Sequence, residues 1–285
     1  MSCKRSILLV SLSVASLLIL WAAWRGGSRC FVLNRINGIP GARERAAIMP
    51  KELDLADTRA TSTTVYNLGY ARFSLPADSP VELTRSSGGS STAIIGKSPA
   101  LSFAFFIPFD PLAPSPLLSV AQSQARKLPE AHAMRRLVED QNLNSVDYFI
   151  QIERTAPIPF SRVFFMKKDD FTLYAFQLIE KSLHRWGRGG IYTFATPATK
   201  GLVHVGEEGV NMNSVHVMFQ SLSGHHAVGL FAYPPKGKEG PVLDLLKPLL
   251  KTFRFTGDSI GTKDAIRAQI EGAGIPVSPQ REEED

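Results

Sequence analysis

The fold is decided by residues 202–233, LVHVGEEGVNMNSVHVMFQSLSGHHAVGLFAY. Strand-forming residues in residues 202–205, 214–221 and 227–233 predict three strands, and short turns that contain glycine separate them. A further strand is expected just before them, at residues 191–194. Strands joined by such short turns are typical of an antiparallel meander, which we therefore expect in the second half of the chain.

The elements outside the meander set the fold class. Strands are expected at residues 70–75, 81–85, 92–95 and 101–107, helices at 129–141, 145–154 and 169–186, and a closing helix and strand at 241–251 and 252–256. A final helix is possible at residues 263–271. Because alternating βα units are absent from this order, we expect an α+β fold, with a mainly antiparallel sheet packed between helices.

This element order resembles the PsbP-like family, which includes the bacterial DcrB-type lipoproteins. The opening strand has the Phe-x-x-Pro string of that family at Phe73–Pro76, and a closing helix and strand follow at residues 245–255. The resemblance covers about 190 residues, but as motifs it includes only two short strings. It implies a sandwich of helices around an antiparallel sheet and a non-enzymatic accessory or binding role, and it assigns no site residues.

An uncharged apolar segment near the start predicts a transmembrane anchor. Residues 7–24, ILLVSLSVASLLILWAAW, would extend about 27 Å as a helix, close to the hydrocarbon thickness of a bilayer. At the C-terminal end of this segment, Trp21, Trp24 and Arg25 are residues typical of the membrane–water interface. The alternative is a cleaved signal peptide, but the run is longer than usual and lacks a small-x-small cleavage site. We expect the anchor to be retained and the lipid bilayer to be its partner.

The orientation of the anchor rests on two opposing signals. Arg25, Arg29 and Arg35 outnumber Lys4 and Arg5, which favours a cytoplasmic domain. A short basic N-terminus before a first apolar helix is, however, typical of exported proteins, and long domains often translocate regardless of that count. We expect a single-pass membrane protein of the cell envelope with an extracytoplasmic domain.

Composition changes predict four segments along the chain. These are an anchor at residues 1–25, a Gly- and Pro-containing linker at 26–64, one globular α+β domain at 65–257, and an acidic, partly disordered tail at 258–285. The only cysteines, Cys3 and Cys30, flank the apolar segment, so the globular domain contains no disulfide. No cofactor is expected.

The charge pattern argues against a nucleic-acid partner. The net charge is +6, and residues 1–65 carry nine Lys or Arg against four Asp or Glu. This excess lies mostly just after the apolar segment, without the dense basic patch and interleaved aromatic residues of nucleic-acid-binding proteins. Another envelope protein is the more consistent partner.

Ser259 is the one catalytic candidate. Gly257-Asp-Ser-Ile-Gly261 matches the G-x-S-x-G pattern of a nucleophile elbow, after an expected strand and before a possible helix. In the order of α/β-hydrolases the histidine lies downstream, yet the last histidine here is His226. Catalysis would need an upstream histidine to fold onto Ser259. The alternative is a loop that leaves the domain, which we favour.

His204 and His216 are the candidate metal ligands. If their two strands pair through a turn near Gly209, the two side chains become cross-strand neighbours. A zinc site would need a third and usually a fourth ligand. Ordinary polar-face histidines are the alternative, which we favour over a metal site.

A basic helix face is a further candidate surface. Five residues lie on or beside the helix expected at 169–186 and could meet anionic headgroups: Lys167, Lys168, Lys181, Arg185 and Arg188. The alternative is a solvated helix face, which we favour. The function favoured by these patterns is a membrane-anchored, non-enzymatic binding or assembly module, with a tethered serine or metal-dependent hydrolase as the alternative.

Overall fold

The computed structural model describes residues 26–38, 41–56, 63–78, 80–88, 91–108, 145–183, 186–207, 211–223, 227–234, 242–257 and 263–277. Their contacts divide the chain into two compact units. The helical unit takes its described residues from 26–47 and 155–183, and the sheet unit contains the others. The expected anchor, residues 7–24, lies outside the described residues. Among those that are described, no helix combines the length and the apolarity needed to cross a membrane.

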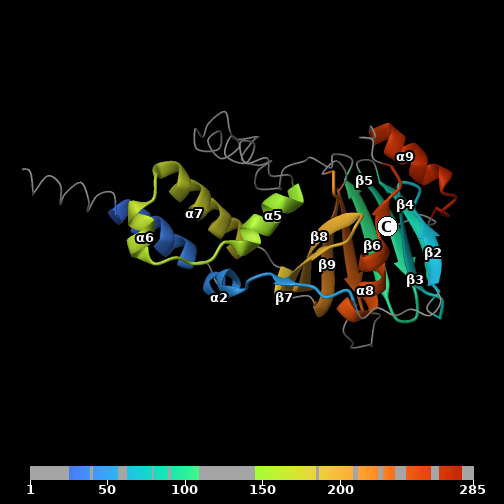
Figure 1. Cartoon of the computed structure of the whole chain (residues 1–285), viewed down its shortest axis with the longest axis horizontal. Helices are drawn as coiled ribbons and strands as arrows, with labels where there is room; N and C mark the ends of the chain where they lie inside the picture. The colour runs from blue at the N-terminus through green and yellow to red at the C-terminus, as the bar shows by residue number, and fades with distance from the viewer. Residues whose placement is uncertain are drawn as a thin grey trace, which may run out of the picture. The chain divides into compact units, whose positions relative to one another are not determined.

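The sheet unit is built on an eight-stranded sheet. Figure 1 shows several of its strands side by side. Its strand order is β1-β7-β8-β9-β10-β6-β5-β4, and only the β1–β7 pair is parallel. The α+β class and the meander of β8, β9 and β10 are therefore confirmed. The bounds are β1 Lys51–Glu52, β4 Glu82–Gly88, β5 Ser91–Lys97, β6 Ser102–Pro108, β7 Trp186–Ala195, β8 Thr199–Glu207, β9 Asn211–Ser221 and β10 Ala227–Tyr233.

A second sheet and a helix complete the core of the sheet unit. β2 (Thr63–Asn67), β3 (Ala71–Pro76) and β11 (Arg254–Phe255) form a three-stranded antiparallel sheet in the order β11-β3-β2. Helix α8 (Val242–Thr252) contacts β3 and β9. It buries one apolar stripe of i, i+4, i+7 and i+8 positions, namely Val242, Leu246, Leu249 and Leu250. The expected closing helix and strand are thus present, and they link the two sheets through one core.

Part of the segment expected to be an acidic tail also belongs to this core. Helix α9 (Lys263–Gly272) forms where a helix was possible, and its Ile270 is 1% exposed. Ile275 is buried as well, and the Arg85 amide donates to the carbonyl oxygen of Pro276 at 2.8 Å. The sheet unit therefore continues to about Val277, because apolar residues there pack against it.

The long helix ends earlier than expected. Helix α5 (Ser145–Arg154) and strand β10 have the predicted bounds, but α7 spans Lys168–Leu183, and Trp186 begins strand β7. Gly187, Gly189 and Gly190, which follow the expected end of the helix, lie in that strand. Gly187 and Gly190 adopt φ values of 88° and 148°, and the register shifts between Trp186 and Gly190. A bulge that uses glycine's freedom at positive φ replaces the predicted helix end.

The helical unit differs from the expected linker and single domain. Residues 26–37 are helical, α2 spans Ala42–Ala47, and α6 spans Phe160–Phe165. With α7 they bury a common cluster that includes Ile36, Ala46, Val163, Tyr174, Ala175 and Leu178. Residues 26–38 and 41–47 fold because they supply one apolar side of this cluster, a partnership that no local pattern in the sequence indicates. For the same reason α6 and α7 group with them rather than with the sheets.

Tyr70 makes the stability of the sheet unit dependent on pH. Its ring lies in the core, 6.2 Å from that of Phe255, and burial raises the pKa of its hydroxyl well above 10. Above about pH 10 the unfolded chain loses this proton while the folded chain keeps it, so the free energy of unfolding falls as pH rises. We expect Tyr70→Phe to weaken this decline, measured by urea unfolding between pH 8 and about 11. An unchanged slope would contradict the burial of the hydroxyl.

Candidate functional site

The two predicted histidines are neighbours. His204 on β8 and His216 on β9 are register partners, and their rings stack with centroids 5.7 Å apart at 16°. The predicted turn near Gly209 falls outside the described residues, but the strands on either side of it pair as expected. Both side chains lie on the sheet face opposite the core residues Val203, Val215 and Val217.

Glu153 of α5, a residue that was not predicted, joins this pair. Its Oε1 lies 3.0 Å from His204 Nε2, and both side chains are buried, at 0% and 1% exposure. With Glu153 ionised, Nε2–H donates to the carboxylate. A signal was present, because Glu153 shares a helix stripe with Val146 and Phe149 at i and i+3. A second pair, Lys200 Nζ to Asp147 Oδ2 at 2.8 Å, also ties α5 to β8.

Aromatic rings enclose His216. The Phe231 ring stacks on it at 4.4 Å and 13°, and the Trp186 ring lies 5.4 Å away. No group of three His, Cys, Asp or Glu side chains suited to a metal occurs among the residues that the structure describes. Glu153 and His204 therefore form a hydrogen-bonded pair, and the His204 ring is the first in a row of stacked rings. The pair orients α5 on the sheet. The third ligand that a zinc site needs does not come from the described residues.

The structure does not place the catalytic candidate. Ser259 lies outside the described residues, and so do His184, His225 and His226. Of the G-x-S-x-G stretch only Gly257, an exposed residue just after β11, is described. Catalysis by Ser259 therefore stays a prediction.

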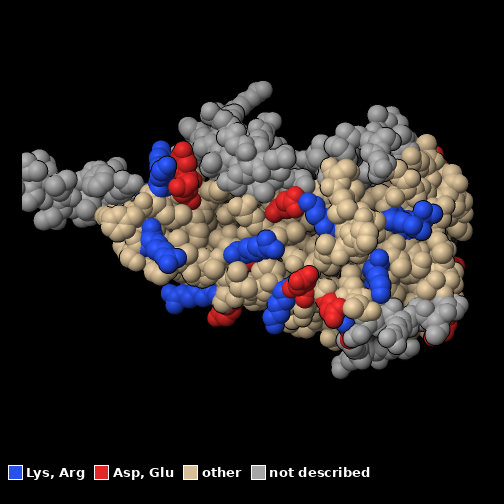
Figure 2. Space-filling model, viewed as in Figure 1, with Lys and Arg blue, Asp and Glu red and all other residues tan. Residues whose placement is uncertain are grey.

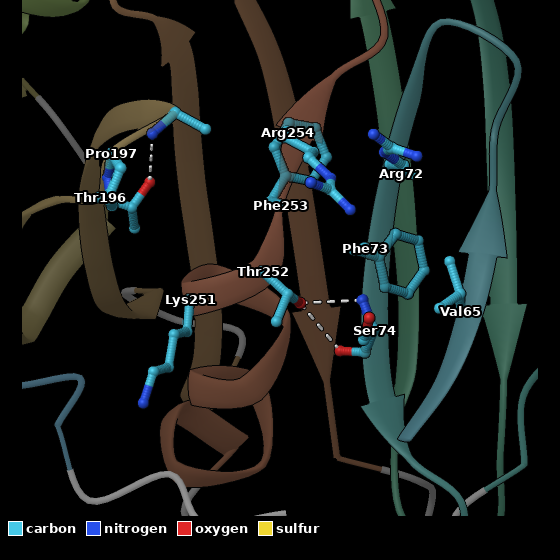
Figure 3. Close-up of a pocket in the computed structure, with 11 residues that line it drawn as sticks. Val65, Arg72, Phe73, Ser74, Thr196, Pro197, Lys251, Thr252, Phe253 and Arg254 are labelled. Atoms are coloured by element: carbon cyan, nitrogen blue, oxygen red, sulfur yellow. Dashed lines mark hydrogen bonds between the residues drawn. The ribbon is translucent and has the colours of Figure 1, made fainter. Parts of the chain in front are cut away.

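A cleft on the sheet unit is the second candidate site. It has a volume of about 260 Å³ and lies where β3 and β11 meet the end of α8 and the turn between β7 and β8. Figure 3 shows its side chains. They are Val65, Arg72, Phe73, Ser74, Thr196, Pro197, Ala198, Lys251, Thr252, Phe253 and Arg254. Three of these are cationic, and none of the lining residues is Asp or Glu.

Two arginines face each other across the paired strands of the cleft. Arg254 on β11 and Arg72 on β3 are direct register partners in the antiparallel pair, and both are exposed. Like charges directly opposite on neighbouring strands repel. Neither arginine forms an ion pair within the part of the chain that is described. An anion between the two guanidinium groups would replace this repulsion with attraction.

The walls of the cleft are held by hydrogen bonds. The Ser74 amide donates to Thr252 Oγ1 at 2.8 Å, and this hydroxyl lies 2.7 Å from the carbonyl oxygen of Pro248, to which it donates. On the other wall the Thr199 amide donates to Thr196 Oγ1 at 3.0 Å. Lys251 is directed away from the arginines in Figure 3, and its Nζ donates to the carbonyl oxygen of Ala56 at 3.4 Å. The arginine pair is therefore the centre of positive charge on a rigid frame.

The described residues do not form the candidate basic helix face. Lys181 is fully buried, and its Nζ donates to the carbonyl oxygen of Thr155 at 2.9 Å. Arg188 lies on β7 instead of beside the helix, and Arg185 is outside the described residues. Only Lys167 and Lys168 remain exposed at the start of α7. On the face shown in Figure 2, Lys and Arg side chains are dispersed, with Asp or Glu beside several of them.

Comparison of the chain with known protein families, with curated proteins and with solved structures found no match. The PsbP-like resemblance therefore stays a prediction from element order.

Proposed function

We propose that the chain is a membrane-anchored, non-enzymatic binding or assembly module of the cell envelope, whose sheet unit holds an anionic group of its ligand. The observation that carries the binding part is the opposed pair Arg72 and Arg254 in a cleft without a lining carboxylate. The uncharged residues 7–24 support the anchor, and the short basic N-terminus before them supports an extracytoplasmic position. The partner would be another envelope protein or a molecule presented there.

The size of the cleft restricts what it can hold. Its volume of about 260 Å³ lies just below the range of small-molecule sites, which begins at roughly 300 Å³. A single carboxylate or phosphate group fits such a volume, and the remainder of a larger partner would lie outside. Guanidinium groups suit both, because their planar array of N–H donors binds two oxygens of one anion at once. We therefore propose recognition of a terminal anionic group.

Anion binding is tested by the melting temperature of the full chain in lipid nanodiscs. Inorganic phosphate and acetate are compared with chloride at constant ionic strength. With a dissociation constant of about 1 mM, 100 mM anion stabilises by about 2.7 kcal/mol, which raises the melting temperature by roughly 5–10 °C. The two anions distinguish a phosphate ligand from a carboxylate ligand. The absence of any shift with either anion would contradict the proposal.

Matched variants locate the site. Arg72→Gln and Arg254→Gln are expected to abolish the anion-induced shift, whereas Arg154→Gln removes the same charge from an exposed position on α5 and is expected to retain it. Without anion, Arg254→Gln is expected to be at least as stable as the parent, because it removes the like-charge pair. Equal loss of the shift in all three variants would indicate a general charge effect instead of a site.

A further inference from the structure

Helix α6 exposes large aromatic side chains in the helical unit. Phe165 is 81% exposed and Phe160 is 43% exposed, although α6 contains only six residues. Val163, on the side of α6 that faces the helical unit, is fully buried in the apolar cluster of that unit. The helix is thus anchored through Val163, and it leaves most of Phe165 and part of Phe160 exposed.

The position of α6 relative to the start of the unit is fixed. A side chain at Gly26 would lie 2.8 Å from a ring carbon of Phe164, so the backbone of residue 26 lies directly against α6. Arg29 then donates three hydrogen bonds to carbonyl oxygens at the end of α6, to Val163 at 2.6 Å, Phe164 at 2.7 Å and Met166 at 2.8 Å. These charge-assisted bonds hold α6 beside the first turn of the helix of residues 26–37 (Figure 1).

This position places α6 where the expected anchor ends. Residues 7–24 are uncharged, Trp21 and Trp24 suit the interface, and residue 26 follows almost directly. A group in contact with residue 26 therefore lies at the level of the lipid headgroups when residues 7–24 span the bilayer. This level suits exposed aromatic rings that insert between headgroups and acyl chains.

The charge of this segment complements an anionic lipid surface. Residues 155–168 contain Arg162, Lys167 and Lys168, and no Asp or Glu. All three cations are exposed, and each can reach headgroup phosphates from the interface. Asp169 and Asp170 follow only in the first turn of α7.

We propose that α6 is a membrane-surface contact that inserts Phe160 and Phe165 into the headgroup region and places Arg162, Lys167 and Lys168 among the phosphates. This inference rests on the anchor of the proposed function and is independent of the cleft. The bilayer is the committed occupant, because the anchor keeps α6 at high local concentration beside it. In this arrangement the helical unit lies on the bilayer surface.

Fluorescence quenching on the full chain tests this contact. In a background with Cys3→Ser and Cys30→Ser, single cysteines are introduced by Ala22→Cys, Phe165→Cys and Met212→Cys and labelled with an environment-sensitive dye. Met212 is the matched control, an exposed apolar residue of β9 in the sheet unit, at 52% exposure. The chain is inserted into vesicles of phosphatidylcholine and phosphatidylglycerol, and quenching by spin-labelled lipid is compared with quenching by aqueous iodide.

The ratio of lipid to iodide quenching is expected to be about fivefold or more higher at position 165 than at position 212. If lipid quenches the label at position 22 but the label at position 165 gives the same ratio as that at 212, the surface contact is overturned. The anchor is then still supported. Absence of lipid quenching at position 22 overturns the anchor and the contact together. The anion response of the cleft is measured separately, so its failure is distinguishable from both.

Discussion

The Phe253→Ala variant is expected to lower the free energy of unfolding by about 3–5 kcal/mol. Phe253 is fully buried where the two sheets and α8 meet. Its ring stacks on Phe219 at 4.1 Å and on Phe105 at 5.8 Å, and it meets Phe255 edge to face at 5.3 Å. Truncation removes this packing and leaves a cavity between elements that cannot collapse independently.

The same substitution also tests the cleft. Phe253 precedes Arg254 and lines the cleft, so its loss is expected to weaken the anion-induced rise in melting temperature. Urea unfolding measures the stability change. Leu245→Ala is the control, because Leu245 lies on α8 with 43% exposure and its truncation is expected to cost less than about 1 kcal/mol. Equal effects of the two variants would contradict the central position of Phe253.

Glu153→Ala is expected to lower the free energy of unfolding by about 3–5 kcal/mol when His204 is protonated and by about 1–3 kcal/mol when it is neutral. The substitution removes the carboxylate that pairs with His204 Nε2 in an environment from which water is excluded. Breaking one partner of a buried polar pair is costly because the other keeps its desolvation penalty. Urea unfolding of the variant and of the parent at one pH measures the loss, and its size shows which of the two cases holds.

Two controls show whether the pair itself is responsible. Asp147→Ala removes a partly exposed acid from the same helix, whose pair with Lys200 is expected to contribute less than about 1 kcal/mol. The double variant Glu153→Leu with His204→Leu is expected to be more stable than the sum of the single effects predicts, because no buried polar group is left. Strictly additive effects would mean that the two side chains do not interact.

Local pattern was enough to predict most elements of the sheet unit. The strands of the meander, the helix at residues 145–154 and the closing helix were predicted within a few residues, because apolar periodicity and turn residues act over short distances. The predicted end of the long helix was wrong, because the glycine-rich residues after it are compatible both with a helix end and with a bulged strand. At residues 187–190 a bulged strand replaced the helix end, and pairing with β8 decided between them.

The sequence by itself determined the fold class, the uncharged segment at residues 7–24 and the cross-strand position of His204 and His216. Only the tertiary structure brought Glu153 to His204, Arg29 to α6, and Arg72 to Arg254. In each case the partners are far apart in the chain. Burial of apolar faces between distant segments sets these contacts, and the periodicity of one segment shows which of its faces is buried but not which partner that face meets.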